Sequence, residues 1–218
     1  MRENTAGVDP LSAGPLTLPE AQVEAIRTAY GTPPREYHNI NHVAEVLRHY
    51  AEVAVGPGWT QPVEVWLAVL YHDAIYEARR SDNETRSARL AVEHLQRWQA
   101  ETGVDAARVS WLIEQTARHG QHLPADFGND ANGDDARHFL DCDMAILGAA
   151  PEVFDAYDQA IAAEYRGHVP GWLFRRNRRR FLKALLERPR IFLSDLFHAR
   201  YDAAARDNLR RLLGIAAR

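Results

Sequence analysis

The chain has 218 residues, enough for one domain with a substantial hydrophobic core, and its formal charge of −4 gives no overall attraction to nucleic acid or an anionic membrane. A charged fraction of 26% beside an apolar fraction of 46% is typical of a folded protein and excludes wholesale disorder. A single cysteine excludes an internal disulfide framework and fits a reducing compartment. Because neither a signal peptide nor a membrane-spanning stretch is indicated, we expect a cytoplasmic protein without a membrane segment.

The N-terminal third predicts a tail and three helices. Residues 1–17 are rich in Gly, Pro, Ser and Thr without periodicity, so we expect a loose tail ahead of a helical domain over 18–218. Leu18-Pro19-Glu20 predicts the start of a first helix, which ends at residues 31–34. A second helix is expected to reach about Val55, and a third to run from about Gln61 through Asp73.

The rest of the chain also predicts helices. Asp82-Asn83-Glu84 has the signals of a helix start, with Gly103 as the break, and a fifth helix is expected to end at 118–120. Pro151 starts another helix, and 172–188 and 195–213 predict two or three more. Since no stretch alternates with period two, we predict an all-α fold, a single-domain multi-helix bundle.

Residues 120–134 are polar and predict a surface loop. Their Asp130-Ala131-Asn132-Gly133-Asp134 run resembles part of a calcium loop. With Gly133 at the turn position, however, the first ligand position holds Gly128 and the twelfth holds Phe139. An EF-hand site is therefore not predicted.

An apolar run over 66–76 contains an adjacent His72 and Asp73. Burying such a pair costs several kcal/mol unless a charged partner compensates it, and a divalent cation is a common partner. Imidazole beside carboxylate suits Zn, Fe, Mn, Ni or Mg. His42, together with an acid from the apolar segment 139–148, either Asp141 or Asp143, would complete a four-ligand site.

The order His, His-Asp, Asp on predicted helices resembles the HD superfamily of metal-dependent phosphohydrolases, and most closely its predicted metal-dependent HD phosphohydrolase subfamily. The resemblance covers about residues 20–213. The matching elements are Arg35-Glu36-Tyr37-His38-Asn39 with His42-Val43, His72-Asp73 with Tyr76, Asn83-Glu84 with Ser87-Ala88, Thr116 with His119, Leu140 to Gly148, and Glu164-Tyr165.

The resemblance implies an HD-type domain with one divalent metal ion (Mn, Fe, Mg, Ni or Zn) held by His42, His72, Asp73 and Asp143; a second ion would need further ligands. Asp143 is preferred to Asp141 because Cys142-Asp143-Met144 matches the pattern around the last ligand of the family. Asp141 would then support the site or start a helix.

The implied activity is hydrolysis of a phosphoester or pyrophosphate bond in a small, nucleotide-like substrate by a metal-activated water. Asp73, Glu84 and His119 are the candidate catalytic residues. The candidate substrate-binding residues are Arg35, Tyr37, His38, Asn83 and Arg178.

Simpler explanations remain open for several of these residues. His42 could be a satisfied core histidine, Asn83-Glu84 a helix cap with a first-turn acid, and His119 a charge at a helix C-terminus. Most of the arginines over 175–180 would point around a helix into solvent, so nucleic-acid binding is not predicted.

Two other functions also stay open. One is a non-catalytic regulatory module that binds metal and nucleotide; the other is a di-iron oxygenase, whose second ion would need ligands from His119, His38, Glu84 or Asp141.

Overall fold

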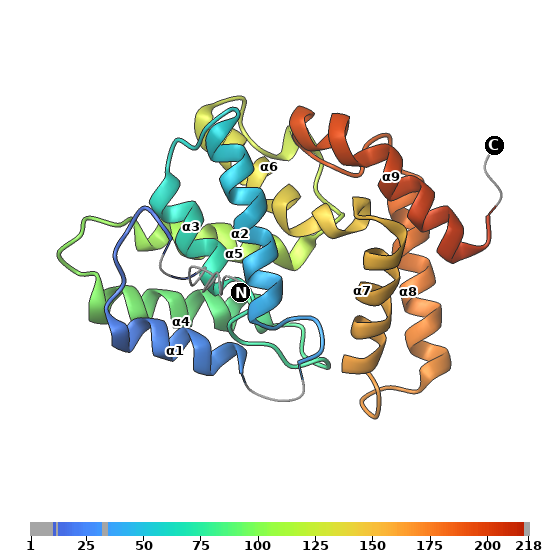
Figure 1. Ribbon diagram of the computed structural model, residues 1–218, viewed down its shortest axis with the longest axis horizontal. Helices are drawn as coiled ribbons and strands as arrows, with labels where there is room; N and C mark the ends of the chain where they lie inside the picture. Colours follow the sequence, from blue (N-terminus) through green and yellow to red (C-terminus); the bar gives the residue numbers. More distant parts are fainter. Residues whose placement is uncertain (1–10, 12, 32–34, 216–218) are drawn as a thin grey trace, which may run out of the picture.

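The computed structural model describes residues 11, 13–31 and 35–215. Within these ranges every regular element is helical, which confirms the predicted all-α fold (Figure 1). The α-helices are α1 (Glu20–Tyr30), α2 (Ile40–Val55), α3 (Pro62–Tyr71), α4 (Asn83–Trp98), α5 (Ala106–Gln115), α6 (Ala131–Met144), α7 (Pro151–Glu164), α8 (Gly171–Leu186) and α9 (Asp195–Leu213). Short 3-10 turns are η2 (Thr116–Arg118), η3 (Pro124–Asp126) and η4 (Ala145–Gly148).

Helix α3 is the centre of the bundle. Every residue from Val65 to Tyr71 is buried, and the helix contacts α2, α4, α5 and α6. A helix that is apolar all round is stable only when it is enclosed, and each large apolar side chain buried here contributes about 1.5–3 kcal/mol. The chain that follows α3 therefore begins inside the protein.

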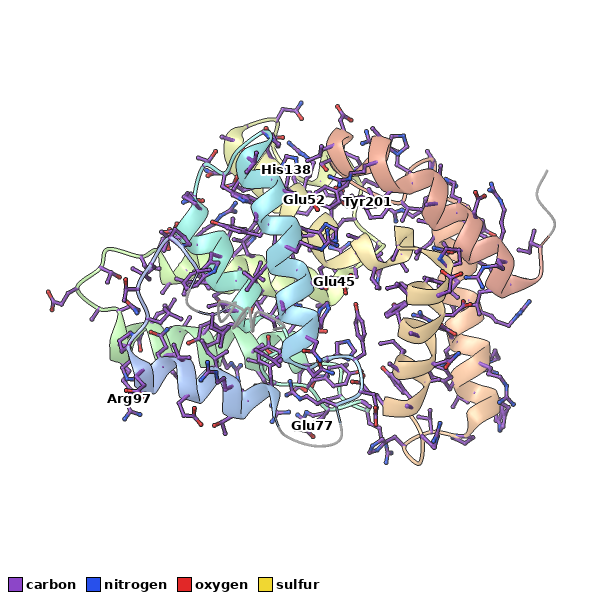
Figure 2. All side chains as sticks on the ribbon, viewed as in Figure 1. Glu45, Glu52, Glu77, Arg97, His138 and Tyr201 are labelled. Atoms are coloured by element: carbon purple, nitrogen blue, oxygen red, sulfur yellow. The ribbon has the colours of Figure 1, made fainter. Side chains whose placement is uncertain are left out.

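The remaining helices surround this centre. Helices α1 and α4 lie on one side, and α7, α8 and α9 lie together on the other (Figure 1). Helix α2 meets α9 through a polar contact, in which the Tyr201 hydroxyl donates to Glu52 at 3.3 Å (Figure 2). None of the described helices combines the length and the apolar character needed to cross a membrane.

Two helix starts matter for the site. The Asn39 side chain accepts a hydrogen bond from the Asn41 backbone N–H and caps α2, so His38 lies just before the helix. The Asp130 side chain accepts from the Gly133 N–H in the same way and caps α6.

The prediction of a loop over 120–134 is wrong at its end, because α6 already begins at Ala131. The acids and small residues that resembled a calcium loop form a helix cap and first turn. Gly133 is required there: a Cβ at this position would lie 2.0 Å from the carbonyl oxygen of Gly128.

Other boundaries also differ from the predictions. Helix α3 ends at Tyr71 rather than Asp73, and α4 ends at Trp98, ahead of Gly103. Within the predicted N-terminal tail, Leu11 is buried and Gly14 packs closely against the ring of Trp66. Residues 1–10 and 12 of that segment, and 32–34 of the predicted helix end, lie outside the described residues.

Candidate metal centre

The four predicted ligands converge from three separate parts of the chain. His42 lies in the first turn of α2, His72 and Asp73 follow the end of α3, and Asp143 lies near the end of α6. The donor atoms of His42, His72 and Asp73 lie within 4.8 Å of one another, so this group could hold a metal ion. Asp143 Oδ1 lies 3.1 Å from His42 Nε2 and 3.6 Å from His72 Nε2.

The two imidazoles face each other with the same nitrogen. His42 Nε2 and His72 Nε2 are 3.1 Å apart. The Nδ1 of His72 lies 2.9 Å from the Val69 carbonyl oxygen, which only accepts, so Nδ1 carries a proton. A neutral His72 therefore presents the lone pair of Nε2 to His42. A histidine held this way through Nδ1 is typical of metal ligands.

The spacing of the donor atoms fits a shared cation. For metal–nitrogen bonds of about 2.1 Å, donors at a right angle lie ~3.0 Å apart and donors at a tetrahedral angle ~3.4 Å apart. Asp73 Oδ2 lies 3.2 Å from His72 Nε2 and 3.5 Å from His42 Nε2, within the same range. His42 differs from His72 in its other ring nitrogen: the buried Nδ1 of His42 has no hydrogen-bond partner in the described part of the chain.

The electrostatics also favour a positive charge at this point. Burial lowers the pKa of His72, but Asp73 and Asp143 outweigh it and raise that pKa well above its ordinary value. Burial also lowers the pKa of His42, but the hydrogen bonds to Asp143 and Asp73 outweigh burial, so this pKa is raised as well. Burial would raise the carboxyl pKa values of Asp73 and Asp143, but the histidines around them hold these values well below the usual range.

Asp141 and Asp143 have different surroundings although they share a helix. Both oxygens of Asp141 point away from the histidines and accept three hydrogen bonds, from the Leu193 N–H, the Ser194 N–H and the Ser194 hydroxyl. Asp143 instead meets His42 with one oxygen and His119 with the other, at 3.1 and 2.9 Å. Asp143 is thus the acid of α6 that lies beside the histidines, and Asp141 anchors the segment before α9.

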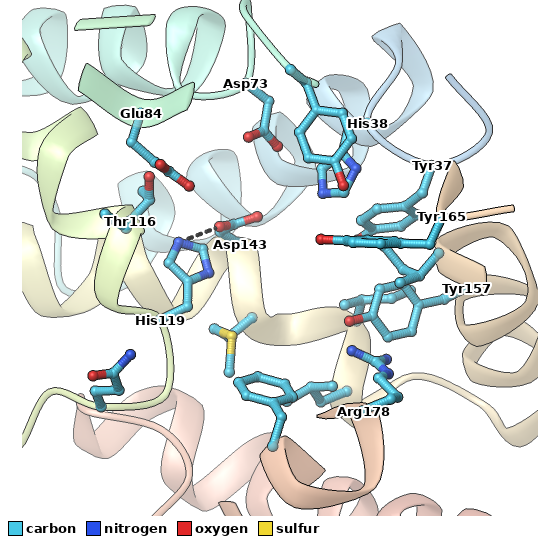
Figure 3. Close-up of a pocket in the computed structure, with 18 residues that line it drawn as sticks. Tyr37, His38, Asp73, Glu84, Thr116, His119, Asp143, Tyr157, Tyr165 and Arg178 are labelled. Atoms are coloured by element: carbon cyan, nitrogen blue, oxygen red, sulfur yellow. Dashed lines mark ion pairs between the residues drawn. The ribbon is translucent and has the colours of Figure 1, made fainter. Parts of the chain in front are cut away.

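A cavity of about 400 Å³ opens onto this cluster (Figure 3). Besides Asp73 and Asp143, several predicted site residues line it: Tyr37, His38, Glu84, His119 and Arg178. Figure 3 shows Glu84 and Thr116 on one side and Tyr37, Tyr157, Tyr165 and Arg178 on the other. A cavity of this size can hold a small organic ligand.

Two predicted substrate-binding residues do not line the cavity. Arg35 donates to the backbone carbonyls of His38, Asp73 and Ala74, so it holds the turn after α3 against the segment before α2. The Asn83 amide exchanges two hydrogen bonds with the backbone of Glu77. Both side chains use their polar groups to order backbone next to the site.

Glu164 holds His38 in place, a role that the sequence did not predict. It is 2% exposed, and its Oε1 accepts from the backbone N–H groups of Tyr37 and His38 while its Oε2 lies 2.6 Å from His38 Nδ1. The His38 ring stacks on Tyr76 with centroids 3.8 Å apart. Glu164 therefore sets the orientation of His38 at the cavity wall; a glutamate in the final turn of an amphipathic helix gives no local signal for this.

Comparison with models of protein families, with curated proteins and with solved structures finds no match for the chain. The case for a function therefore depends on the residues and on the geometry described above.

Proposed function

We propose that this chain is an HD-type, metal-dependent phosphohydrolase that cleaves a phosphoester or pyrophosphate bond. The observation that carries the proposal is the pair of imidazole Nε2 atoms 3.1 Å apart, with Asp73 and Asp143 oxygens beside them, at the wall of a 400 Å³ cavity. His72 Nε2 offers a lone pair, and the Asp73 and Asp143 carboxylates beside it bring negative charge to the same point. A divalent cation bound by His42, His72, Asp73 and Asp143 would use these donors and balance that charge.

When bound, such an ion would polarise a phosphoryl oxygen and lower the pKa of a coordinated water. The chain itself supplies donors around the reacting group. His119 lies 2.9 Å from Asp143 and His38 is fixed by Glu164, so both rings present nitrogens at the cavity. Glu84, on the same side of the cavity as His119 in Figure 3, adds a carboxylate that can accept a proton from the attacking water. Phosphoryl transfer needs this kind of positioning more than covalent chemistry.

The same arrangement offers a place for a second ion. One oxygen of Asp143 faces His42 and the other faces His119, and Glu84 lines the same cavity, so Asp143, His119 and Glu84 are the residues that would hold a second ion. The number of bound ions is therefore part of the test.

The test measures bound metal and phosphate release on the same preparation. Elemental analysis should find at least one transition-metal ion per chain, and a panel of phosphomonoesters, diesters and pyrophosphates should yield phosphate with Mn²⁺ present. His72→Ala should lose both properties. The exposed His168, changed to alanine, is the matched control and should keep both.

Other results would redirect the proposal. A metal-free protein, or hydrolysis that survives His72→Ala, would refute it. Metal and nucleotide binding without turnover would favour the regulatory module, and two iron ions per chain with oxygen consumption would favour the oxygenase.

A further inference from the structure

The cavity has two chemically different ends. At one end lie the metal ligands and the carboxylate of Glu84; at the other lie aromatic and apolar side chains and one guanidinium (Figure 3). The residues of the second end are Tyr157, Tyr165, Phe181 and Arg178, and Tyr37 lies between the two ends, with its ring centroid 4.7 Å from those of both His42 and Tyr157. One ligand could touch both ends, because both line the same cavity.

Arg178 is held in a defined orientation at the aromatic end. Its Nε donates to Asp158 at 2.9 Å, and its Cζ lies 5.0 Å from the Tyr157 ring and 5.7 Å from the Phe181 ring. Burial opposes the charged form, yet Tyr157 and Asp158 raise the pKa of Arg178, so the group stays cationic. A planar group fixed by one ion pair and two rings presents its N–H groups in a constant direction.

One terminal nitrogen of Arg178 lacks a partner among the described residues. The Tyr157 side chain also interacts with the guanidinium, but the buried Nη2 has no hydrogen-bond partner in the described part of the chain. A buried donor without an acceptor costs free energy that a ligand acceptor would recover. Since Asp158 already balances the charge of Arg178, a neutral oxygen satisfies the remaining N–H groups, and a second phosphate is not needed.

The walls beside Arg178 select a flat group. The rings of Tyr37 and Tyr157 lie 4.7 Å apart at an angle of 66°, and Tyr165 lies next to them in Figure 3. Aromatic walls of this kind bind planar rings by stacking and edge contacts. A planar ring with an oxygen at its edge would meet the N–H groups of Arg178, whereas a ring with an amino group there would place donor against donor.

We propose that Arg178 determines specificity, and that the cavity selects phosphorylated ligands whose flat ring carries an oxo group over those with an amino group at the same position. This inference rests on the proposed function, because the metal end is taken to hold the phosphate. For nucleotides it predicts a preference for inosine monophosphate (IMP) over adenosine monophosphate (AMP), and for uridine monophosphate (UMP) over cytidine monophosphate (CMP). Each pair differs in one oxo or amino group and in the proton on the ring nitrogen beside it.

The test compares these four nucleotides on the whole protein with Mn²⁺. Wild-type kcat/KM should favour IMP over AMP and UMP over CMP by about 10- to 100-fold, the range of one hydrogen bond to a charged group. Arg178→Met keeps the apolar stem and removes the donors, so both ratios should fall toward one. Arg180→Met, which changes an exposed arginine on the same helix, should leave the ratios unchanged.

Binding measured by calorimetry separates the two proposals. If none of the four nucleotides is hydrolysed, the phosphohydrolase proposal fails for them, but the dissociation constants still test Arg178. Equal or reversed preference, no binding of IMP or UMP, or a preference that persists in Arg178→Met would overturn the inference. The wild-type comparison does not depend on the folding of any variant.

Discussion

Replacing each of the two acids of α6 by asparagine separates folding from metal binding. Asp141→Asn turns one carboxylate oxygen into an amide nitrogen that cannot accept a hydrogen bond. The three donors around Asp141 lie at 2.6–2.7 Å, so at least one of them loses its acceptor in a buried site. We expect a loss of about 2 kcal/mol from this unpaired donor.

For a chain of this size that loss lowers Tm by roughly 4–8 °C. Metal content should stay at the wild-type level, because neither oxygen of Asp141 faces the histidines. Asp143→Asn should instead lower metal content and leave the Tm of the metal-free protein near its wild-type value. It removes a donor 3.1 Å from His42 Nε2, and metal affinity should fall by more than the roughly 10- to 100-fold that loss of a supporting partner causes.

The assay combines a thermal melt of the metal-free protein with elemental analysis after loading with Mn²⁺ and desalting. Asp158→Asn serves as a control acid outside the cluster and should keep the metal. The reasoning is refuted if Asp141→Asn releases the metal while Asp143→Asn retains it.

Three further predictions concern other parts of the chain. The pKa of His49 is lowered to about 4, first by burial and then by Arg48 and Arg200. The stability contributed by neutral His49 is therefore complete above pH 6.5 and disappears as the pH falls toward 4. This amounts to about 3 kcal/mol, and urea midpoints at pH 7 and pH 4.5 should differ less in His49→Gln than in the wild type or in His168→Gln. Gly133→Ala should lower Tm by more than 5 °C, roughly the effect of 2 kcal/mol, because its Cβ would meet a backbone oxygen at 2.0 Å; an unchanged melt would show that the start of α6 can move. Chelation with EDTA should lower Tm by about 5–10 °C, as expected for an ion present at 100 times its dissociation constant, and excess Mn²⁺ should restore it; a melt that ignores both additions would argue against a tightly bound ion.

The helices could be predicted because their signals are local. Apolar residues at helical spacing, Pro151 at a helix start and the Gly31 region at a helix end each act within a few residues, and the observed helices follow them closely. The prediction failed at 131–134, where a cap and first turn contain the same small and acidic residues as a loop.

The polar residues were harder to assign because their roles depend on distant partners. Arg35 and Asn83 carry groups that bind substrates in many proteins, but here they bind backbone. Glu164 meets His38 across 126 positions in the chain, which no local pattern encodes.

The sequence by itself determined that the protein is helical and that an apolar helix leads directly to His72-Asp73, since both follow from the spacing of neighbouring residues. Only the tertiary structure decided which groups surround that pair. Asp141 and Asp143 lie two residues apart on one helix, and their directions differ by enough that one faces the histidines and the other the segment before α9. Which of the two acids faces the histidines depends on how α6 packs against α2 and on the chain that precedes α9, and sequence spacing does not specify that.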